Sequence, residues 1–337
     1  MEKKIYYPHL DLLKGLAILL MVMGHVIPWT LESDILQKPF MLLDEKSLGL
    51  ALVYQVIYSF HMPLLFFVSG FLFFRPIQHN KHYLMDVMKK RVKRILLPYI
   101  MTGTLLYLSR GHWGYWFLQC LFFMDVLVAL VFYIVDYFKL EIKSEVCLMV
   151  LVGAFLYLLE RVSVNWEQNT DGIIVVGRLL HFYPAFIMGV MIRQYEKLRA
   201  WISNEILLFL CFITYVLLFV ISGYHIPKVG FIVNLFLPLS MILYLNHLLK
   251  NIRGGLCHKL LSWIGKNSME VYILHVFFVM VFKKVGIFMM SLDSPITIVT
   301  FQIVYSFMLS LIAITLSVIT SWFLKENKII KLLLFGL

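Results

Sequence analysis

Residues 11–28 read Asp-Leu-Leu-Lys-Gly-Leu-Ala-Ile-Leu-Leu-Met-Val-Met-Gly-His-Val-Ile-Pro, and this stretch decides the fold class. Most of it is apolar, as a helix that spans a membrane requires. Three ionisable residues interrupt it: Asp11, Lys14 and His25. An ionisable group inside a span costs free energy unless it is paired or faces a polar cavity. Each of the three is therefore a candidate for function.

The spacing of these residues predicts a polar stripe along one side of the helix. Lys14 and His25 are close to three helical turns apart, which puts them on the same face and separates them by roughly 16 Å along the axis. Asp11 lies one turn from Lys14, and we expect the two side chains to pair.

Composition excludes a soluble globular domain. Apolar residues make up 61% of the chain and the mean hydropathy is +0.86, which indicates repeated membrane spans. We predict an all-α polytopic membrane protein, folded over residues 1–337 as one transmembrane domain with no appended soluble domain. Ten spans are expected near 10–29, 50–74, 94–109, 114–137, 145–160, 174–193, 203–223, 229–249, 267–286 and 296–323.

The basic residues predict the orientation of these spans. Most of the 30 Lys and Arg residues fall on the cytoplasmic side if both termini are placed there, and the richest inner loop is 75–94. The net charge of +11 is thus explained by topology, and we expect no nucleic acid partner. The four cysteines have no disulfide or metal-site spacing, so neither is predicted. We expect the protein to lie in the cytoplasmic (inner) membrane of the cell. Its expected partners are the lipid bilayer and a substrate.

Arg91 and Arg94 end the basic loop before the third expected span. Three residues apart on a helix, they share a face. Their guanidinium groups suit a phosphate clamp for a cytosolic cofactor. The alternative is that they only hold the span in place, as basic loops commonly do.

Three polar residues are expected in outer halves of spans. His61 precedes Pro63 in the second span and either faces His25 or is a packed histidine that donates to a backbone carbonyl. Arg178 and His181 lie one turn apart at the outer end of the sixth span. They either meet an acceptor substrate there or simply touch water.

Three further polar residues have no single interpretation from sequence. Asp125, in the fourth span, either orients a histidine, pairs with Lys14 or serves as the structural partner of a buried Arg or Lys. In the ninth span His275 shares a face with Ser268 and Tyr272 by its spacing, and Glu270 lies off that face.

The order of these features along the chain resembles the integral-membrane acyltransferase family 3. Lys14, ten residues and His25 match the family's first-helix pattern, in which arginine is frequent at the basic position. Arg91 and Arg94 match its Arg-x-x-Arg pattern. Similar phrases are Phe60-His-Met-Pro-Leu-Leu-Phe-Phe-Val-Ser-Gly70, Trp116-Phe-Leu, Phe186-Ile-Met-Gly189 and Ser268-Met-Glu-Val-Tyr-Ile-Leu-His275.

The resemblance implies an enzyme that transfers an acyl group, most simply acetyl, from cytosolic acyl-CoA to a hydroxyl group. The acceptor would be a cell-surface or lipid-linked carbohydrate. His25 would be the general base, Lys14 and Asp11 would belong to the catalytic stripe, and the coenzyme A phosphates would lie near Arg91, Arg94 and Lys14. His61, Arg178 and His181 would face the acceptor. Two alternatives remain at this point: a transporter or flippase of a glycan or lipid-linked sugar, and a structural partner of another synthase.

Overall fold

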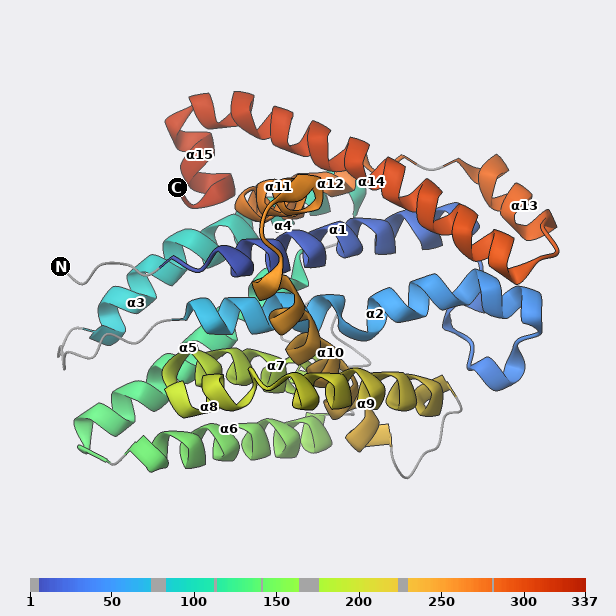
Figure 1. Ribbon diagram of the computed structural model, residues 1–337. Coiled ribbons are helices and arrows are strands. Elements are labelled where there is room, and N and C mark those ends of the chain that lie inside the picture. The colour runs from blue at the N-terminus through green and yellow to red at the C-terminus, as the bar shows by residue number, and fades with distance from the viewer. Residues whose placement is uncertain are drawn as a thin grey trace. The chain divides into compact units, whose positions relative to one another are not determined.

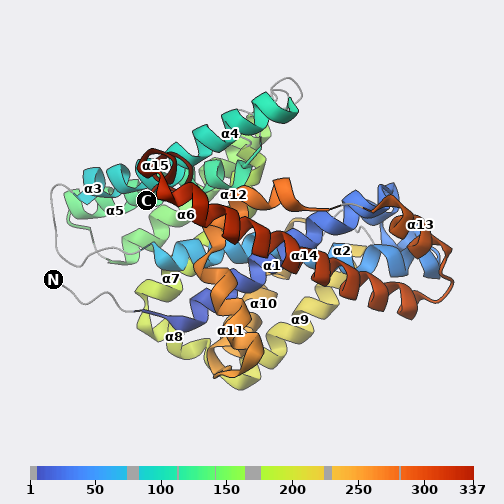
Figure 2. The same cartoon turned by 90° about the horizontal axis from the view of Figure 1, so that it is seen from above.

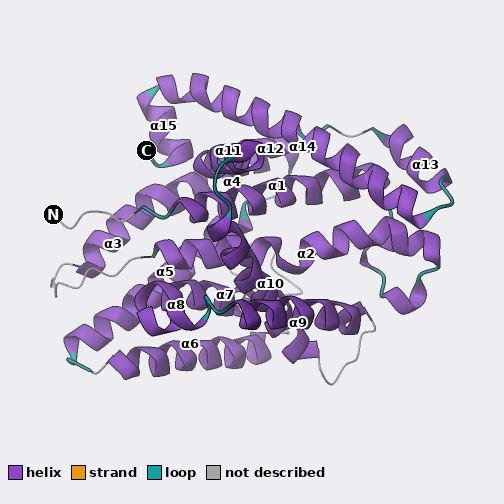
Figure 3. Ribbon diagram, viewed as in Figure 1, coloured by secondary structure: helices purple, strands orange, loops and turns teal. Residues whose placement is uncertain are grey.

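The computed structural model describes residues 6–73, 83–111, 114–140, 142–163, 176–223, 230–280 and 282–337. Within these ranges the chain is helical and contains no strand, so the all-α prediction is confirmed there (Figure 3).

The helices lie along the chain as follows (Figure 1). They are α1 (Pro8–Leu31), η1 (Asp34–Gln37), η2 (Phe40–Leu42), α2 (Glu45–Leu72), α3 (Tyr83–Arg91), the π-helical turn η3 (Val92–Leu96), α4 (Leu97–Arg110), α5 (Trp116–Tyr137), α6 (Ile142–Ser163), α7 (Val176–Gln194), α8 (Glu196–Trp201), α9 (Glu205–Gly223), α10 (Gly230–Asn251), α11 (Gly255–Lys266), α12 (Ser268–Phe278), α13 (Lys283–Ser291), α14 (Pro295–Glu326) and α15 (Lys328–Phe335).

Each of the ten expected spans coincides with helix, but not all of these helices have the length and hydropathy of a span. Among the described residues six do: α1, α2, α5, α9, α10 and α14. A seventh is obtained if α12 and α13 count as one span. Ten spans, and the orientation of the termini, stay predictions. The chain is a multi-pass membrane protein.

The ninth expected span, 267–286, is not one continuous helix. α12 ends at Phe278 and α13 begins at Lys283, with an angle of 87° between their axes. Val279 has an extended backbone, which ends α12. A hydropathy pattern cannot predict this break, because residues 276–282 are all apolar and the first charged residue, Lys283, comes only after it.

The chain divides into two compact units. Unit 1 consists of Met1–Val68 and Lys197–Ser321, and unit 2 consists of Ser69–Glu196 and Trp322–Leu337. Each unit is built around one helix.

α1 is the central helix of unit 1. It packs against α10, α11, α12 and α13, and α2 contacts it through the Tyr58 hydroxyl, which donates to the Gly24 carbonyl. In the apolar 18-residue stretch of α1, 78% of the residues are buried, whereas in the corresponding stretch of α9 only 17% are buried. α9 packs along α10, and both helices can be followed in Figure 2. Most apolar side chains of α9 are at the surface, as expected for contact with lipid.

The contact between α1 and α11 depends on two glycines. A Cβ on Gly15 would overlap the carbonyl oxygen of Leu261, and a Cβ on Gly265 would overlap the carbonyl oxygen of Asp11. Small residues let two helix backbones approach this closely. The crossing places α11 beside the polar start of α1.

α5 is the central helix of unit 2, where it packs against α3, η3, α6 and α7. The end of α2 joins this unit through Gly70, which lies against the backbone of Phe186 in α7. α15 packs on α4, and Gly336 at its end has a φ of +66° that favours glycine.

Candidate functional site

Three histidines of unit 1 form the first polar group. The His25 ring of α1 stacks on the His275 ring of α12, with centroids 5.3 Å apart and an interplanar angle of 27°. On its own helix His25 contacts Trp29, with centroids 5.4 Å apart. His61 of α2 and His275 both interact electrostatically with His25. Of the two interpretations of His61, both hold: it lies near His25 and it is also bonded to a carbonyl.

The hydrogen bonds of these histidines differ. Nδ1 of His61 lies 2.8 Å from the Ile57 carbonyl oxygen, and Nδ1 of His275 lies 2.9 Å from the carbonyl oxygens of Val271 and Tyr272. A carbonyl oxygen only accepts, so both Nδ1 atoms are the donors. The described residues contain no hydrogen-bond partner for either ring nitrogen of His25. His25 alone keeps both nitrogens available for a substrate.

The start of α1 carries the expected pair. Lys14 Nζ lies 2.7 Å from Asp11 Oδ1, so this pairing is confirmed. The Tyr6 hydroxyl donates to the other carboxylate oxygen of Asp11. This hydrogen bond raises the pKa of Tyr6 to about 12, which keeps the phenol protonated at neutral pH. Asp11 is 6% exposed, and its charge compensates that of Lys14.

Arg91 in unit 2 is held by Asp125. The Arg91 Nε atom lies 3.1 Å from Asp125 Oδ2, and the guanidinium group lies over the Phe73 ring. Asp125 is 1% exposed, and its oxygens have no well-aligned hydrogen bond within the described part of the chain. The structure therefore favours the structural interpretation of Asp125, as the partner of an arginine, here the half-buried Arg91.

Arg94 has different surroundings from Arg91. It is exposed, and between the two residues the helix changes into the π-helical turn η3, in which Leu97 N–H bonds to the Val92 carbonyl. Because a π-helical turn is wider than an α-helical turn, the positions of Arg91 and Arg94 around the helix differ from those expected on an α-helix. Single π-helical turns inside α-helices are frequent at functional sites.

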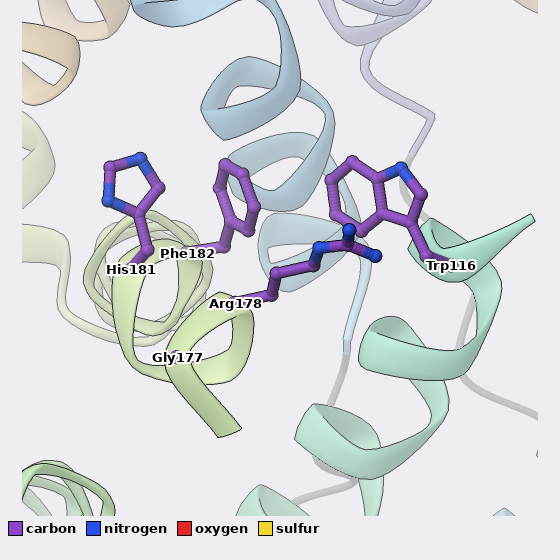
Figure 4. Close-up of a pocket in the computed structure, with 5 residues that line it drawn as sticks. All are labelled: Trp116, Gly177, Arg178, His181 and Phe182. Atoms are coloured by element: carbon purple, nitrogen blue, oxygen red, sulfur yellow. The ribbon is translucent and has the colours of Figure 1, made fainter. Parts of the chain in front are cut away.

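Arg178 and His181 line one pocket of about 360 Å³ in unit 2 (Figure 4). The Arg178 side chain extends from α7 towards the indole of Trp116, with Cζ 5.0 Å from the ring centroid. Phe182 stacks on Trp116 and contacts His181. Tyr115, just before Trp116, has a φ of +64°, uncommon for an aromatic residue.

Several features of these sites were missed from sequence. α11 falls in a loop between expected spans, and its apolar residues are too few to resemble a span. Tyr6 gives no signal beyond its position before Pro8, a residue favoured at the first helical position. Among the residues the structure describes, no group of three or more His, Cys, Asp or Glu side chains is arranged to hold a metal ion.

The fold and the buried histidines define a multi-pass membrane protein with groups suited to proton transfer. A family model described as an acyltransferase domain matches residues 7–324. The chain belongs to this family, the acyltransferase family 3 that the motifs indicate, and is a membrane acyltransferase. No curated protein and no solved structure matches it.

Proposed function

We propose that this protein is an O-acyltransferase of the cytoplasmic membrane. It takes an acyl group, most simply acetyl, from cytosolic acyl-CoA and transfers it to a hydroxyl of a cell-surface or lipid-linked carbohydrate. The observation that carries the proposal is His25: within a chain that matches the acyltransferase model, it lies on the central helix of unit 1 with its ring nitrogens unbonded to the described residues.

His25 is the general base in this proposal. Its imidazole removes the proton of the acceptor hydroxyl while the hydroxyl oxygen attacks the thioester carbonyl carbon. The carbon–sulfur bond then breaks, and the imidazolium returns the proton to the departing thiolate. The products are an ester and free coenzyme A. A neutral imidazole is required at the start, because only its unprotonated nitrogen can take up the proton.

The basic residues recognise the donor. Arg94 is exposed and free to contact a phosphate, whereas Arg91 has its Nε occupied by Asp125 and offers only its terminal nitrogens. Lys14, partly neutralised by Asp11, retains two ammonium protons for a further contact. Arg178 and His181 bind the acceptor.

The test is a comparison of surface polysaccharides by mass spectrometry. Deletion cells are complemented with the wild-type gene, with His25→Ala or with His247→Ala. His247 lies on α10, and among the described residues its hydrogen-bond partner is Asn251, one turn away, which makes it a matched control. We expect O-acyl groups with the wild type and with His247→Ala and none with His25→Ala.

A different pattern would support a transporter instead. In that case the His25→Ala cells keep the ester groups while the amount of exported glycan falls. A structural partner of another synthase predicts that the purified protein neither hydrolyses nor transfers acyl groups from acyl-CoA. Transfer that is lost when Arg91 and Arg94 are both replaced by alanine excludes that alternative.

A further inference from the structure

His275 carries a buried polar atom that the proposed reaction does not yet use. The residue is 2% exposed, and its Nε2 has no hydrogen-bond partner among the described residues. Leaving a buried acceptor without a hydrogen bond is energetically unfavourable, because the atom has lost its contact with water. Such an atom in a folded protein calls for a ligand or another explanation.

The backbone fixes which nitrogen of His275 is the acceptor. Nδ1 lies 2.9 Å from the carbonyl oxygens of both Val271 and Tyr272, so the proton is on Nδ1. Within the described part of the chain no acidic side chain forms an ion pair with this ring, so a doubly protonated ring would be a buried cation without a counter-charge from those residues. The neutral ring therefore presents a lone pair on Nε2, on the side that faces away from its own helix.

The position of this lone pair is beside the base. The His275 and His25 rings are stacked, and stacked rings do not hydrogen-bond to each other through their edges. Nε2 of His275 is thus left for a molecule that occupies the same place as the substrate of His25. A lone pair attracts a neutral donor such as O–H or N–H and repels an anion.

We propose that Nε2 of His275 accepts a hydrogen bond from a second donor group of the acceptor, next to the hydroxyl that His25 deprotonates. This inference rests on the proposed function and deepens it. The acceptor class is then one with two neighbouring donors, such as the adjacent hydroxyl or amide groups of a carbohydrate. His275 is a binding and positioning residue, and His25 remains the proton carrier.

Three substitutions separate this role from a structural one. In His275→Gln the amide oxygen reaches about as far as Nε2 and still accepts a hydrogen bond. In His275→Asn the shorter amide retains the donor for the Val271 carbonyl but loses the acceptor at the Nε2 position. His275→Phe retains the ring volume without either nitrogen.

The experiment uses the full-length protein in lipid nanodiscs. The donor is radiolabelled acetyl-CoA, and the acceptor probe is surface polysaccharide purified from the deletion cells. We expect His275→Asn and His275→Phe to raise the acceptor KM roughly tenfold to a hundredfold, with the donor KM unchanged. His275→Gln should stay within about threefold of the wild type. Thermal unfolding of each variant checks folding, and His275→Phe replaces His275→Asn if the latter does not fold.

Two results would overturn the inference while leaving the proposed function intact. One is wild-type KM values in all three variants, which would mean that Nε2 bonds only to a buried water. The other is an equal loss of kcat in the Gln and Asn variants, which would make His275 a proton carrier or a packing residue. If the wild type transfers no acyl group, the proposed function fails and this inference fails with it.

Discussion

α1 and α5 are the central helices of the two units, but they bury different kinds of polar group. α1 carries His25, which stacks on a second histidine. Near its start α1 also carries a lysine–aspartate pair, whose carboxylate accepts a hydrogen bond from a tyrosine hydroxyl. α5 buries the Asp125 carboxylate against a single arginine. Neutral imidazoles with an available nitrogen suit proton transfer. A buried ion pair and an arginine on an aromatic ring suit the binding and positioning of charge.

The two helices also differ in the surroundings of their buried carboxylates, Asp11 in α1 and Asp125 in α5. Asp11 has two partners close to the helix start, where a negative charge is stabilised by the helix dipole. Asp125 lies in the interior of its helix, and of the residues that the structure describes Arg91 is its ion-pair partner. We therefore expect the two carboxylates to differ in their effect on stability.

The largest effect is expected at His25. His25→Ala should lower kcat by about 10²–10⁴-fold, because it removes the proposed general base of the acceptor hydroxyl, while the KM values for both substrates change little. Steady-state kinetics on the purified protein measure this, with His247→Ala as the control. If His25→Ala changes only the KM values, His25 serves in substrate binding. The contrast between proton transfer at α1 and the binding of charge at α5 would then not hold.

Asp125→Asn should destabilise the protein by about 1–3 kcal/mol, because it leaves the half-buried Arg91 charge without its partner. Asp11→Asn should cost at most about 1 kcal/mol, because the Asp11 side chain is 9% exposed and that of Asp125 only 1%, so the first pair is closer to a surface ion pair. Thermal unfolding in detergent compares the two. Replacing both members, by Arg91→Met with Asp125→Leu, should recover most of the loss. Equal destabilisation by the two single variants would contradict the distinction drawn here.

Gly15→Ala in unit 1 and Gly70→Ala in unit 2 should each cost about 1–3 kcal/mol, because the new methyl group overlaps the backbone of Leu261 or Phe186. Gly153→Ala is the control, since its Cβ would lie 3.5 Å from the Tyr183 ring, an ordinary contact. The same unfolding assay applies. A stable Gly15→Ala protein would show that α1 and α11 are not in close contact.

The smallest effects are expected at exposed arginines of unit 2. Arg94→Ala should raise the acyl-CoA KM about tenfold through the loss of a charge-assisted hydrogen bond, and Arg178→Ala should raise the acceptor KM instead. Lys90→Ala, at a second exposed cation of the same basic segment, controls for Arg94. If Lys90→Ala has the same effect as Arg94→Ala, the basic loop serves orientation only.

How far the sequence predicts this protein depends on whether the relevant interaction is local. The Asp11–Lys14 pair is three residues apart on one helix, so spacing alone predicts it. The partner of Asp125 was left open among three possibilities, because Arg91 is distant in sequence and reaches Asp125 only after folding. The break between α12 and α13 was missed because hydropathy averages over a window and is insensitive to the extended backbone of Val279 and Phe282.

The sequence by itself determined the all-α class, the place of the apolar helices and the candidates His25 and Lys14, since ionisable residues in apolar stretches are conspicuous. Only the tertiary structure decided which histidines meet and which nitrogens remain available. It also revealed α11, whose close crossing at Gly15 and Gly265 depends on the backbone of a partner helix. Burial and pairing are properties of contacts between distant residues, and hydropathy and spacing along one helix do not contain them.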